Sequence, residues 1–424
     1  MKMRKTTILF RRFASGAAHL EGKVLPAQSF AEPNIIAIPA LTHLYPSVQD
    51  RLRGQNRSAF HVVNLDHAKS RFRIWKDALP NVSPYYAVKC NPNSRVLSLF
   101  AELGMGFDVA SVSEIDAVLD CGGDPKDIIY ANPVKETSQI WKAAERKVDL
   151  TTFDSHEELE KIARHHPETK LLLRLLPDDS SARCPMGKKY GAPVGAFRSL
   201  LSRAAQLNLR VEGVSFHVGS GNTNPRAWGH AMRLARHAFD IAASDPHMTN
   251  MTTLNIGGGF PSDLDLFDDV ARVVRDTSKE LFPHETNTRI IAEPGRYFAE
   301  GLQTLAVNVI GKRTPEDLGQ ETGSDMYYVN DSLYGSFNSI VYDHATLKEP
   351  LVLNGFGETI TTPKRDASLW GQTCDGLDCI AKNIALPRLS VGDWVLFPSM
   401  GAYTSAAASR FNGFAPSEPL YVGC

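Results

Sequence analysis

At 424 residues, the chain is long enough for two domains or for one barrel with an addition. Its 46 basic and 47 acidic residues nearly cancel, so charge gives no reason to expect nucleic acid or a membrane surface as a partner. No run of about 18 apolar residues occurs, which argues against a membrane-spanning helix.

The first twenty residues contain five lysines or arginines and no acid. This composition is typical of a disordered basic tail, and it also fits an organellar transit peptide. The six cysteines are far apart, with no C-x-x-C pair and no metal-site spacing. Free thiols in a reducing compartment are the simplest interpretation, so we expect a cytoplasmic protein, with organellar import as the alternative.

Between about residues 60 and 295, short β-rich runs alternate with amphipathic helical runs. The β-rich runs are FHVVN (60–64), YYAVK (85–89), FDVAS (107–111), IIYAN (128–132), LTTFD (150–154), KLLLRLL (170–176), VEGVSFHVG (211–219), TTLNIGGG (252–259) and RIIAE (289–293). Two helices between them begin with a serine and a glutamate at capping-box spacing, Ser111 with Glu114 and Ser155 with Glu158. Eight or nine such units predict an α/β fold with a (β/α)8 barrel, and a doubly wound open sheet is the alternative.

After about residue 300 the pattern changes to strand-like runs with turn residues between them. LAVNVIGKR, MYYVN, PLVLNG and DWVLFP show little helical periodicity, which indicates a mainly antiparallel β-domain, either a sandwich or a barrel. The predicted organisation is a disordered basic segment at 1–25, a segment at 26–63 that adds to the β-domain, the barrel at 64–302 and the β-domain at 303–424.

Polar residues and glycines follow the predicted barrel strands, at the ends where the active sites of such barrels lie. They are Lys89, Asp108, Asn132, Arg174, His217, Gly257 to Gly259 and Glu293. A lysine that leaves an apolar strand can form a Schiff base with an aldehyde cofactor. Taken alone, Lys89 also fits an ordinary lysine that snorkels at a strand end.

The other strand-end residues suit a planar, phosphorylated cofactor. The GGG run presents bare backbone N–H groups to a phosphate, although it could also make a plain turn. His217 could pack on the ring and Ser220 could bind the phosphate. In AEPGRY, Glu293 and Arg296 could bind a protonated ring nitrogen and a phosphate; an exposed Glu–Arg pair would instead contribute little.

The β-domain holds a second group of polar residues, and its members are Tyr334, Tyr342, Asp343, His344, Cys374, Asp375, Asp378 and Tyr403. Two aspartates could bind the distal ammonium of a diamine-like substrate and hold its carboxylate end toward the cofactor. Cys374 could donate a proton, or it could be a small buried apolar side chain.

With these residues assembled, the chain resembles the eukaryotic ornithine decarboxylases, which are fold-type III pyridoxal-phosphate (PLP) enzymes. The resemblance covers about residues 55 to 415 and rests on PYYAVKCN, FDVASVSEI, LLLR, ARCPMGKKYGA, FHVGSG, GGGFP, AEPGRYF, YGSFNSIVYDHA, TCDGLD and MGAYT. ARCPMGKKYGA is most similar to the plant branch. The departures at Val109, Ser332 and Gln372 remove no group that the chemistry needs.

The resemblance implies an alanine racemase-like barrel and β-domain, pyridoxal 5′-phosphate as cofactor, and decarboxylation of L-ornithine to putrescine, the first step of polyamine biosynthesis. It implies these catalytic residues: Lys89, Cys374, His217 and Glu293. The implied cofactor-binding residues are Lys89, Asp108, Arg174, His217, Ser220, Gly257, Gly258, Gly259, Glu293, Gly295, Arg296 and Tyr403. The implied substrate-binding residues are Tyr334, Tyr342, Asp343, His344, Asp375 and Phe411. No metal is implied.

Roles also follow from the resemblance. Lys89 would form the Schiff base, His217 would stack on the ring, and Glu293 would bind the ring nitrogen. Asp343 of one subunit and Asp375 of the other would bind the distal ammonium, while Cys374 of that other subunit would donate the proton. The resemblance therefore implies a homodimer with two shared active sites.

Two alternatives remain open. A bifunctional lysine/ornithine decarboxylase is the nearer one, because a single methylene gives only about 1–3 kcal/mol of discrimination. In the plant branch, lysine-accepting relatives replace the histidine of YDHA with an aromatic residue, so His344 favours ornithine. The second alternative is a non-catalytic paralogue that resembles antizyme inhibitor, and regulation by an antizyme-type partner stays open. Such paralogues lose cofactor-binding residues, whereas this chain keeps Lys89, Glu293 and Arg296.

Overall fold

The computed structural model describes residues 45–248, 250–283 and 287–423, all of which belong to one compact unit. The predicted basic segment 1–25 and the first part of the segment 26–63 lie outside these residues. Among the helices in the described ranges, none combines the length and the apolar character that a membrane span needs.

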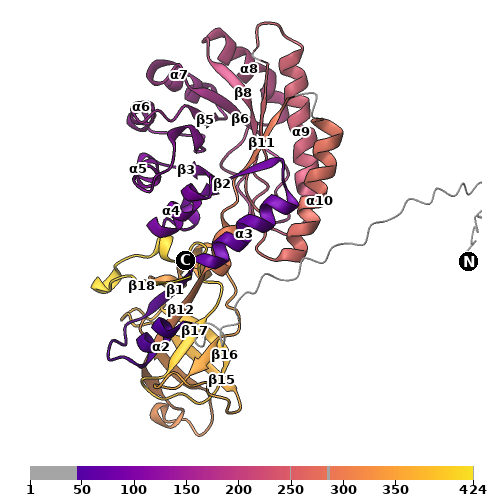
Figure 1. Ribbon diagram of the computed structural model, residues 1–424. Coiled ribbons are helices and arrows are strands. Elements are labelled where there is room, and N and C mark those ends of the chain that lie inside the picture. The colour runs from indigo at the N-terminus through magenta and orange to yellow at the C-terminus, as the bar shows by residue number, and fades with distance from the viewer. Residues whose placement is uncertain (1–44, 249, 284–286, 424) are drawn as a thin grey trace, which may run out of the picture. The chain divides into compact units, whose positions relative to one another are not determined.

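Eight parallel strands close into a barrel, which is the predicted architecture (Figure 1). In barrel order they are β10 (Thr253–Asn255), β11 (Arg289–Ala292), β2 (Val82–Ala87), β3 (Gly106–Val109), β4 (Ile128–Tyr130), β5 (Leu150–Phe153), β6 (Lys170–Arg174) and β8 (Arg210–Ser215). The ring closes where β8 pairs with β10, with Gly213 opposite Thr253. A Cβ at Gly213 would lie 1.7 Å from the Thr253 carbonyl oxygen, so only glycine fits this closure.

The helices between the strands lie around the barrel (Figure 1). They are α3 (Leu65–Ala78), α4 (Ser94–Glu102), α5 (Val112–Asp120), α6 (Thr137–Glu145), α7 (His156–His165), α8 (Phe197–Gln206), α9 (Arg226–Ala243) and α10 (Leu264–Leu281). Side-chain caps begin several of them; the Ser111 hydroxyl accepts a hydrogen bond from Glu114 N at 3.2 Å, as the capping-box spacing predicts. The Glu114 carboxylate reaches back to Ala110 N rather than to Ser111 N.

Side chains of the barrel strands alternate between two cores because successive residues of a strand point to opposite faces. Tyr86 and Phe107 belong to the large core that the helices cover. Tyr85, Leu172 and Ile291 belong to a separate small cluster formed by strand residues. The barrel is therefore filled, and its open end is free for a site.

The second domain is an eight-stranded mixed sheet with its own apolar core. Its strands are β1 (Phe60–Asn64), β12 (Gln303–Arg313), β13 (Asp325–Val329), β14 (Leu351–Leu353), β15 (Arg365–Trp370), β16 (Cys379–Leu386), β17 (Trp394–Phe397) and β18 (Glu418–Val422). Most pairs are antiparallel, whereas β13 with β15 and β1 with β18 are parallel. Helix α2 (Pro46–Arg53) packs on this sheet through Val48 and Leu52.

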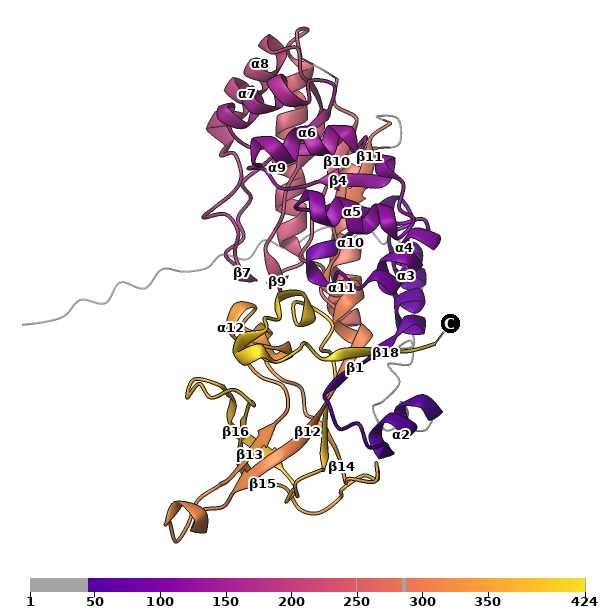
Figure 2. The ribbon, with the colours of Figure 1, turned by 90° about the vertical axis from the view of Figure 1, so that its left-hand side faces the viewer.

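The run FHVVN (60–64) begins the predicted alternation, although the predicted segment 26–63 assigns most of it to the β-domain; it is not a barrel strand. It forms β1, which pairs antiparallel with β12 and parallel with β18 (Figure 2). All five residues of β1 are buried, so its composition does not differ from that of a barrel strand. Only its pairing partners, β12 and β18, show that this run belongs to the β-domain and not to the barrel. The predicted domain boundaries remain a prediction.

Short elements lie where the β-domain contacts the barrel: β7 (Ala182–Cys184), β9 (Ser220–Asn222), α11 (Arg296–Ala299) and α12 (Ser339–Tyr342). The strands β7 and β9 form a two-stranded ribbon outside both larger sheets. In Figure 2 this ribbon lies at the end of the barrel nearest α12.

Candidate active site

Lys89 lies directly after β2, in a single 3-10 turn formed by Val88–Cys90. Its Nζ donates a hydrogen bond to Asp108 Oδ2 on the neighbouring strand β3 at 2.5 Å. The Asp108 side chain is 2% exposed and that of Lys89 is 37% exposed. Burial lowers the pKa of Lys89, but Asp108, Tyr403 and Glu293 together raise this pKa above its ordinary value. Lys89 is therefore a reachable ammonium that already has its counter-ion.

Glu293 follows β11 and is almost completely buried. Its Oε1 accepts a hydrogen bond from Asn255 Nδ2 at 2.6 Å, and Asn255 Oδ1 in turn accepts one from Gly257 N at 2.9 Å. Burial raises the pKa of Glu293 to about 7, and the nearby Asp108 charge acts in the same direction. A cation placed beside this carboxylate would stabilise its ionised form.

His217 follows β8 and presents a neutral imidazole. Its Nδ1 accepts a hydrogen bond from Gly219 N at 2.9 Å, which leaves the proton of the neutral ring on Nε2. Burial, followed by the charges of Arg174 and Lys89, keeps the pKa of His217 well below its ordinary value. A Cβ at Gly258 would lie 2.7 Å from both His217 Nε2 and the Glu293 carbonyl oxygen, so the glycine run fits against the ring only without side chains.

Arg296 begins α11 and joins the barrel to the β-domain. Its Nη2 donates hydrogen bonds to Ser220 Oγ at 3.1 Å and to Asp343 Oδ1 and Oδ2 at 2.7 and 2.8 Å. Its Nε is buried and has no hydrogen-bond partner among the described residues. An unpaired buried donor is costly, so an acceptor at this position would be stabilising.

Asp343 follows α12 and is buried in the same cluster. Besides Arg296, it accepts a hydrogen bond from Arg183 Nη2 of β7 at 2.8 Å. Sequence reasoning assigned Asp343 to the substrate and gave Arg183 no role. The structure pairs Asp343 with two arginines.

Tyr403 and Gly295 bring two further segments against the lysine turn. Tyr403 N donates a hydrogen bond to the Cys90 carbonyl oxygen at 2.9 Å, with Tyr403 itself in the left-handed region at φ 56°. Such a conformation is uncommon for a bulky residue and is typical of functional sites. A Cβ at Gly295 would lie 3.0 Å from Cys90 Cβ, so the chain passes very close there.

Arg174 ends β6 beside the loop that follows it. Its guanidinium carbon lies 5.6 Å from the centre of the Tyr190 ring, and its Nη2 lies 3.8 Å from Met186 Sδ. Because the charge of Arg174 lowers the pKa of His217, Arg174 acts on the same site as the imidazole.

The remaining predicted residues form a second, exposed cluster in the β-domain. The rings of Tyr334 and Phe411 stack with centres 4.2 Å apart, and the Tyr334 hydroxyl donates a hydrogen bond to Asp375. Cys374 is exposed, and its Sγ lies 3.5 Å from Asn412 Oδ1. No polar contact found in the described part of the chain joins these residues to Lys89. Tyr342 and His344 are also exposed.

Asp378, from the same TCDGLD motif, has a structural position. It is 1% exposed and accepts hydrogen bonds from Leu333 N at 2.9 Å and Thr373 Oγ1 at 2.7 Å. It therefore braces the two loops that carry Tyr334 and Cys374. Sequence spacing gave no signal that distinguished Asp378 from Asp375.

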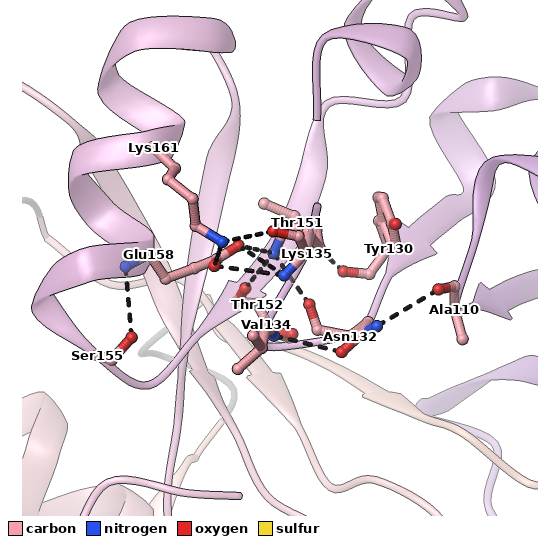
Figure 3. Close-up of polar contacts among 10 residues, drawn as sticks. All are labelled: Ala110, Tyr130, Asn132, Val134, Lys135, Thr151, Thr152, Ser155, Glu158 and Lys161. Carbon is pink, nitrogen blue, oxygen red and sulfur yellow. Dashed lines mark hydrogen bonds and ion pairs between the residues drawn. The ribbon is translucent and has the colours of Figure 1, made fainter. Parts of the chain in front are cut away.

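A buried network between β4 and β5 was also missed (Figure 3). The Lys135 ammonium donates hydrogen bonds to the carbonyl oxygens of Asn132 and Thr152 at 2.9 and 2.8 Å, and its Nζ lies 2.9 Å from Glu158 Oε1. Glu158, expected to complete a capping box, instead binds Lys135 and Lys161. Three partners thus satisfy the buried ammonium, and its two backbone hydrogen bonds connect the loop after β4 to β5.

The cluster fits a phosphorylated pyridine aldehyde. Lys89 offers an amine, Glu293 a buried carboxylate for a ring nitrogen, and His217 a neutral ring against bare glycine backbone. Arg296 contributes a buried, unpaired Nε–H for a phosphate beside Ser220.

Comparison with known proteins agrees with this fit. Residues 65–300 match the pyridoxal-binding domain of the pyridoxal-dependent decarboxylases. An ornithine decarboxylase of Rattus norvegicus is 46% identical over 385 residues, covering 87% of this chain and 81% of the relative. An antizyme inhibitor 2 of Xenopus laevis is 46% identical over 378 residues, covering 87% and 82%.

Among solved structures, the arginine decarboxylase of Paramecium bursaria Chlorella virus, bound to agmatine, has a TM-score of 0.82 and 36% identity. The match covers 91% of this chain and 99% of that one. The chain therefore belongs to the pyridoxal-dependent decarboxylases, in the family that contains the eukaryotic ornithine decarboxylases, and its cofactor is pyridoxal 5′-phosphate.

Proposed function

We propose that this chain decarboxylates L-ornithine to putrescine and carbon dioxide, the first step of polyamine biosynthesis. The observation that carries the proposal is the Lys89–Asp108 pair at the barrel mouth, beside buried Glu293 and neutral His217. The similarity to the rat ornithine decarboxylase supports the choice of substrate.

The residues of this chain divide the work as follows. Lys89 Nζ would hold the cofactor aldehyde, and Asp108 Oδ2, 2.5 Å away, is the nearest acceptor for the proton that this amine must lose. Glu293 would face the ring nitrogen, while Arg296, Ser220 and the glycine backbone would hold the phosphate. When bound, the cofactor supplies an electron sink for the electron pair released with carbon dioxide.

His217 needs to remain neutral so that it adds no second positive charge beside the protonated ring nitrogen. Burial and the charges of Arg174 and Lys89 ensure this by keeping its pKa low. Asn255 fixes one oxygen of Glu293, which orients the carboxylate. Together these contacts preorganise the charges before substrate binds.

The substrate's distal ammonium would bind two carboxylates, Asp343 beside the cofactor site and Asp375 in the exposed cluster. Because Asp375 and Cys374 have no polar contact with Lys89 within one described chain, we propose that a second copy supplies them. The proposed homodimer would also cover Phe411, Leu377 and Tyr342, which are 41%, 78% and 73% exposed here. Cys374 Sγ of that copy would then donate the proton to Cα.

The alternative that this chain is a non-catalytic paralogue similar to antizyme inhibitor needs a separate test. The Xenopus antizyme inhibitor is as similar in sequence to this chain as the rat enzyme is. What argues for an enzyme is that Lys89, Glu293, Arg296 and Cys374 are all retained. We place the activity in the cytoplasm, consistent with free cysteines among the described residues.

Release of carbon dioxide from ornithine, lysine and arginine, measured side by side with and without added cofactor, tests the proposal. We expect ornithine to be the best substrate and the purified protein to absorb at about 420 nm. Faster turnover of lysine would favour the bifunctional alternative. Absence of both the band and turnover would favour a regulatory paralogue.

A further inference from the structure

Arg183 reaches the site from outside both main sheets. It lies on the two-stranded ribbon, in which Ala182 pairs with Asn222 and Cys184 pairs with Ser220, so that Arg183 is opposite Gly221. A Cβ at Gly221 would lie 3.0 Å from Arg183 Cβ and 3.3 Å from Arg183 Nε. The missing side chain at Gly221 leaves the passage through which the arginine crosses β9 to Asp343.

The two arginines that hold Asp343 differ in how firmly they are held themselves. The Arg296 side chain is 10% exposed and also contacts Ser220 and Glu300. The Arg183 side chain is 35% exposed, and among the described residues its only polar contact is the one to Asp343. A two-stranded ribbon is marginally stable by itself. Arg183 is therefore the partner that can leave.

We propose that Arg183 is an internal competitor, which occupies on Asp343 the position that the substrate's distal ammonium takes. The inference rests on the role of Asp343 in the proposed function. A third cation at this carboxylate is opposed by both guanidinium groups. Arg296 has a phosphate to pair with once the cofactor is bound, whereas Arg183 has only Asp343 or solvent. Binding of a diamine therefore displaces Arg183 and releases β7 from β9.

This competition lowers the affinity of the site for every substrate, and it does so most for substrates without a distal positive charge. A substrate whose distal group is neutral or acidic has no charge with which to replace the guanidinium, so it is rejected more strongly than by Asp343 alone. Cationic substrates bind less tightly than they would without Arg183. The arginine thus exchanges affinity for charge selectivity at the distal end of the substrate.

The test is calorimetric binding of putrescine to the cofactor-loaded protein, which requires no turnover. Arg183→Gln and Arg183→Met should each bind putrescine about fivefold more tightly than wild type, on the scale of one partly exposed ion pair. Arg183→Lys keeps a competing cation and should change affinity by less than about twofold. Arg233→Gln breaks the exposed pair with Glu280 and serves as the matched control that leaves binding unchanged.

Hydrogen exchange of a peptide covering residues 182–184 gives a second readout. Saturating putrescine should accelerate exchange there in the wild-type protein and have little effect in Arg183→Gln, where the ribbon is already released. Unchanged or weaker putrescine binding in both neutral variants overturns the inference. Asp343→Asn, measured in parallel, distinguishes failure of this inference from failure of the proposed function. If the Arg183 variants fail but Asp343→Asn weakens putrescine binding, only the competition by Arg183 is refuted. If Asp343→Asn leaves binding unchanged, the proposed role of Asp343 is refuted as well.

Discussion

The Lys89 cluster and the Cys374 cluster use similar residue types in very different surroundings. Asp108, Glu293 and Asp343 are 1%, 5% and 6% exposed, and each has a cation or an amide as partner within the chain. Cys374 is exposed, and Asp375 binds a tyrosine stacked on a 41% exposed Phe411. The carboxylates of the first cluster are thus paired within one chain. The second cluster has side chains that solvent reaches, as expected of one half of a site shared between two subunits.

Replacing the lysine tests the complete cluster and should have the largest effect. Lys89→Ala removes the amine that we propose holds the cofactor, so we expect turnover to fall by about a thousandfold or more and the band at about 420 nm to disappear. Absorbance and carbon dioxide release measure these two changes. Near-normal activity would refute the cofactor assignment.

Cys374→Ala tests the exposed cluster alone. We expect the cofactor band to remain and putrescine formation to fall by about a hundredfold, the typical contribution of a general acid. Chromatography of the amine products is the measurement, and it would also detect products protonated on the cofactor instead of on Cα. An unchanged putrescine yield would remove Cys374 from the mechanism.

Protonation of Glu293 gives a pH test of the buried cluster in protein freed of cofactor. Its pKa is raised to about 7 in the folded chain from an ordinary 4.5, so the folded state binds a proton more tightly than the unfolded state. The contribution of Glu293 to the free energy of unfolding is therefore complete below about pH 4.5 and is lost as the pH rises through about 7. The expected change in the free energy of unfolding is about 3 kcal/mol. Glu293→Gln cannot titrate, so denaturant melts of the variant should show a flatter pH dependence across this window. An identical slope in both proteins would contradict the assignment.

Mixing the two inactive variants tests whether the clusters meet across subunits. Random exchange of Lys89→Ala with Cys374→Ala chains makes half of the dimers mixed, and each mixed dimer has one intact site of two. Up to about a quarter of wild-type activity should therefore return. If native mass spectrometry demonstrates exchange and no activity returns, the shared site is wrong.

Much of the Lys89 cluster could be predicted because strand ends of a barrel converge on one face. Five of its residues lie at or just after the end of a β-rich run: Lys89, Asp108, Arg174, His217 and Glu293. Once these runs are taken as parallel barrel strands, the five side chains are expected at the same end of the barrel. The glycine run was predicted for the same site as bare backbone for a phosphate, and the structure adds that a Cβ at Gly258 would meet the His217 ring. These positions could be predicted because the barrel topology repeats regularly along the chain.

Other features depended on contacts between distant segments. Nothing in FHVVN distinguishes a barrel strand from β1, whose partners lie more than 200 residues away. Glu158 has capping-box spacing, yet the carboxylate turns to Lys135 because that buried ammonium needs a counter-ion. Asp378 is buried whereas Asp375, three residues away in the same motif, is only partly buried, because the Asp378 carboxylate accepts hydrogen bonds from the backbone of Leu333 and Thr373.

The sequence by itself determined the α/β fold class and the order along the chain of the strand-end residues that we propose bind the cofactor, because periodicity and residue order are local properties of the chain. Only the tertiary structure decided what each charge is paired with. It placed Asp343 between Arg296 and Arg183, and it left Cys374 on the surface. Pairing depends on which side chains meet after the chain has folded, and the spacing of residues along the chain does not contain that information.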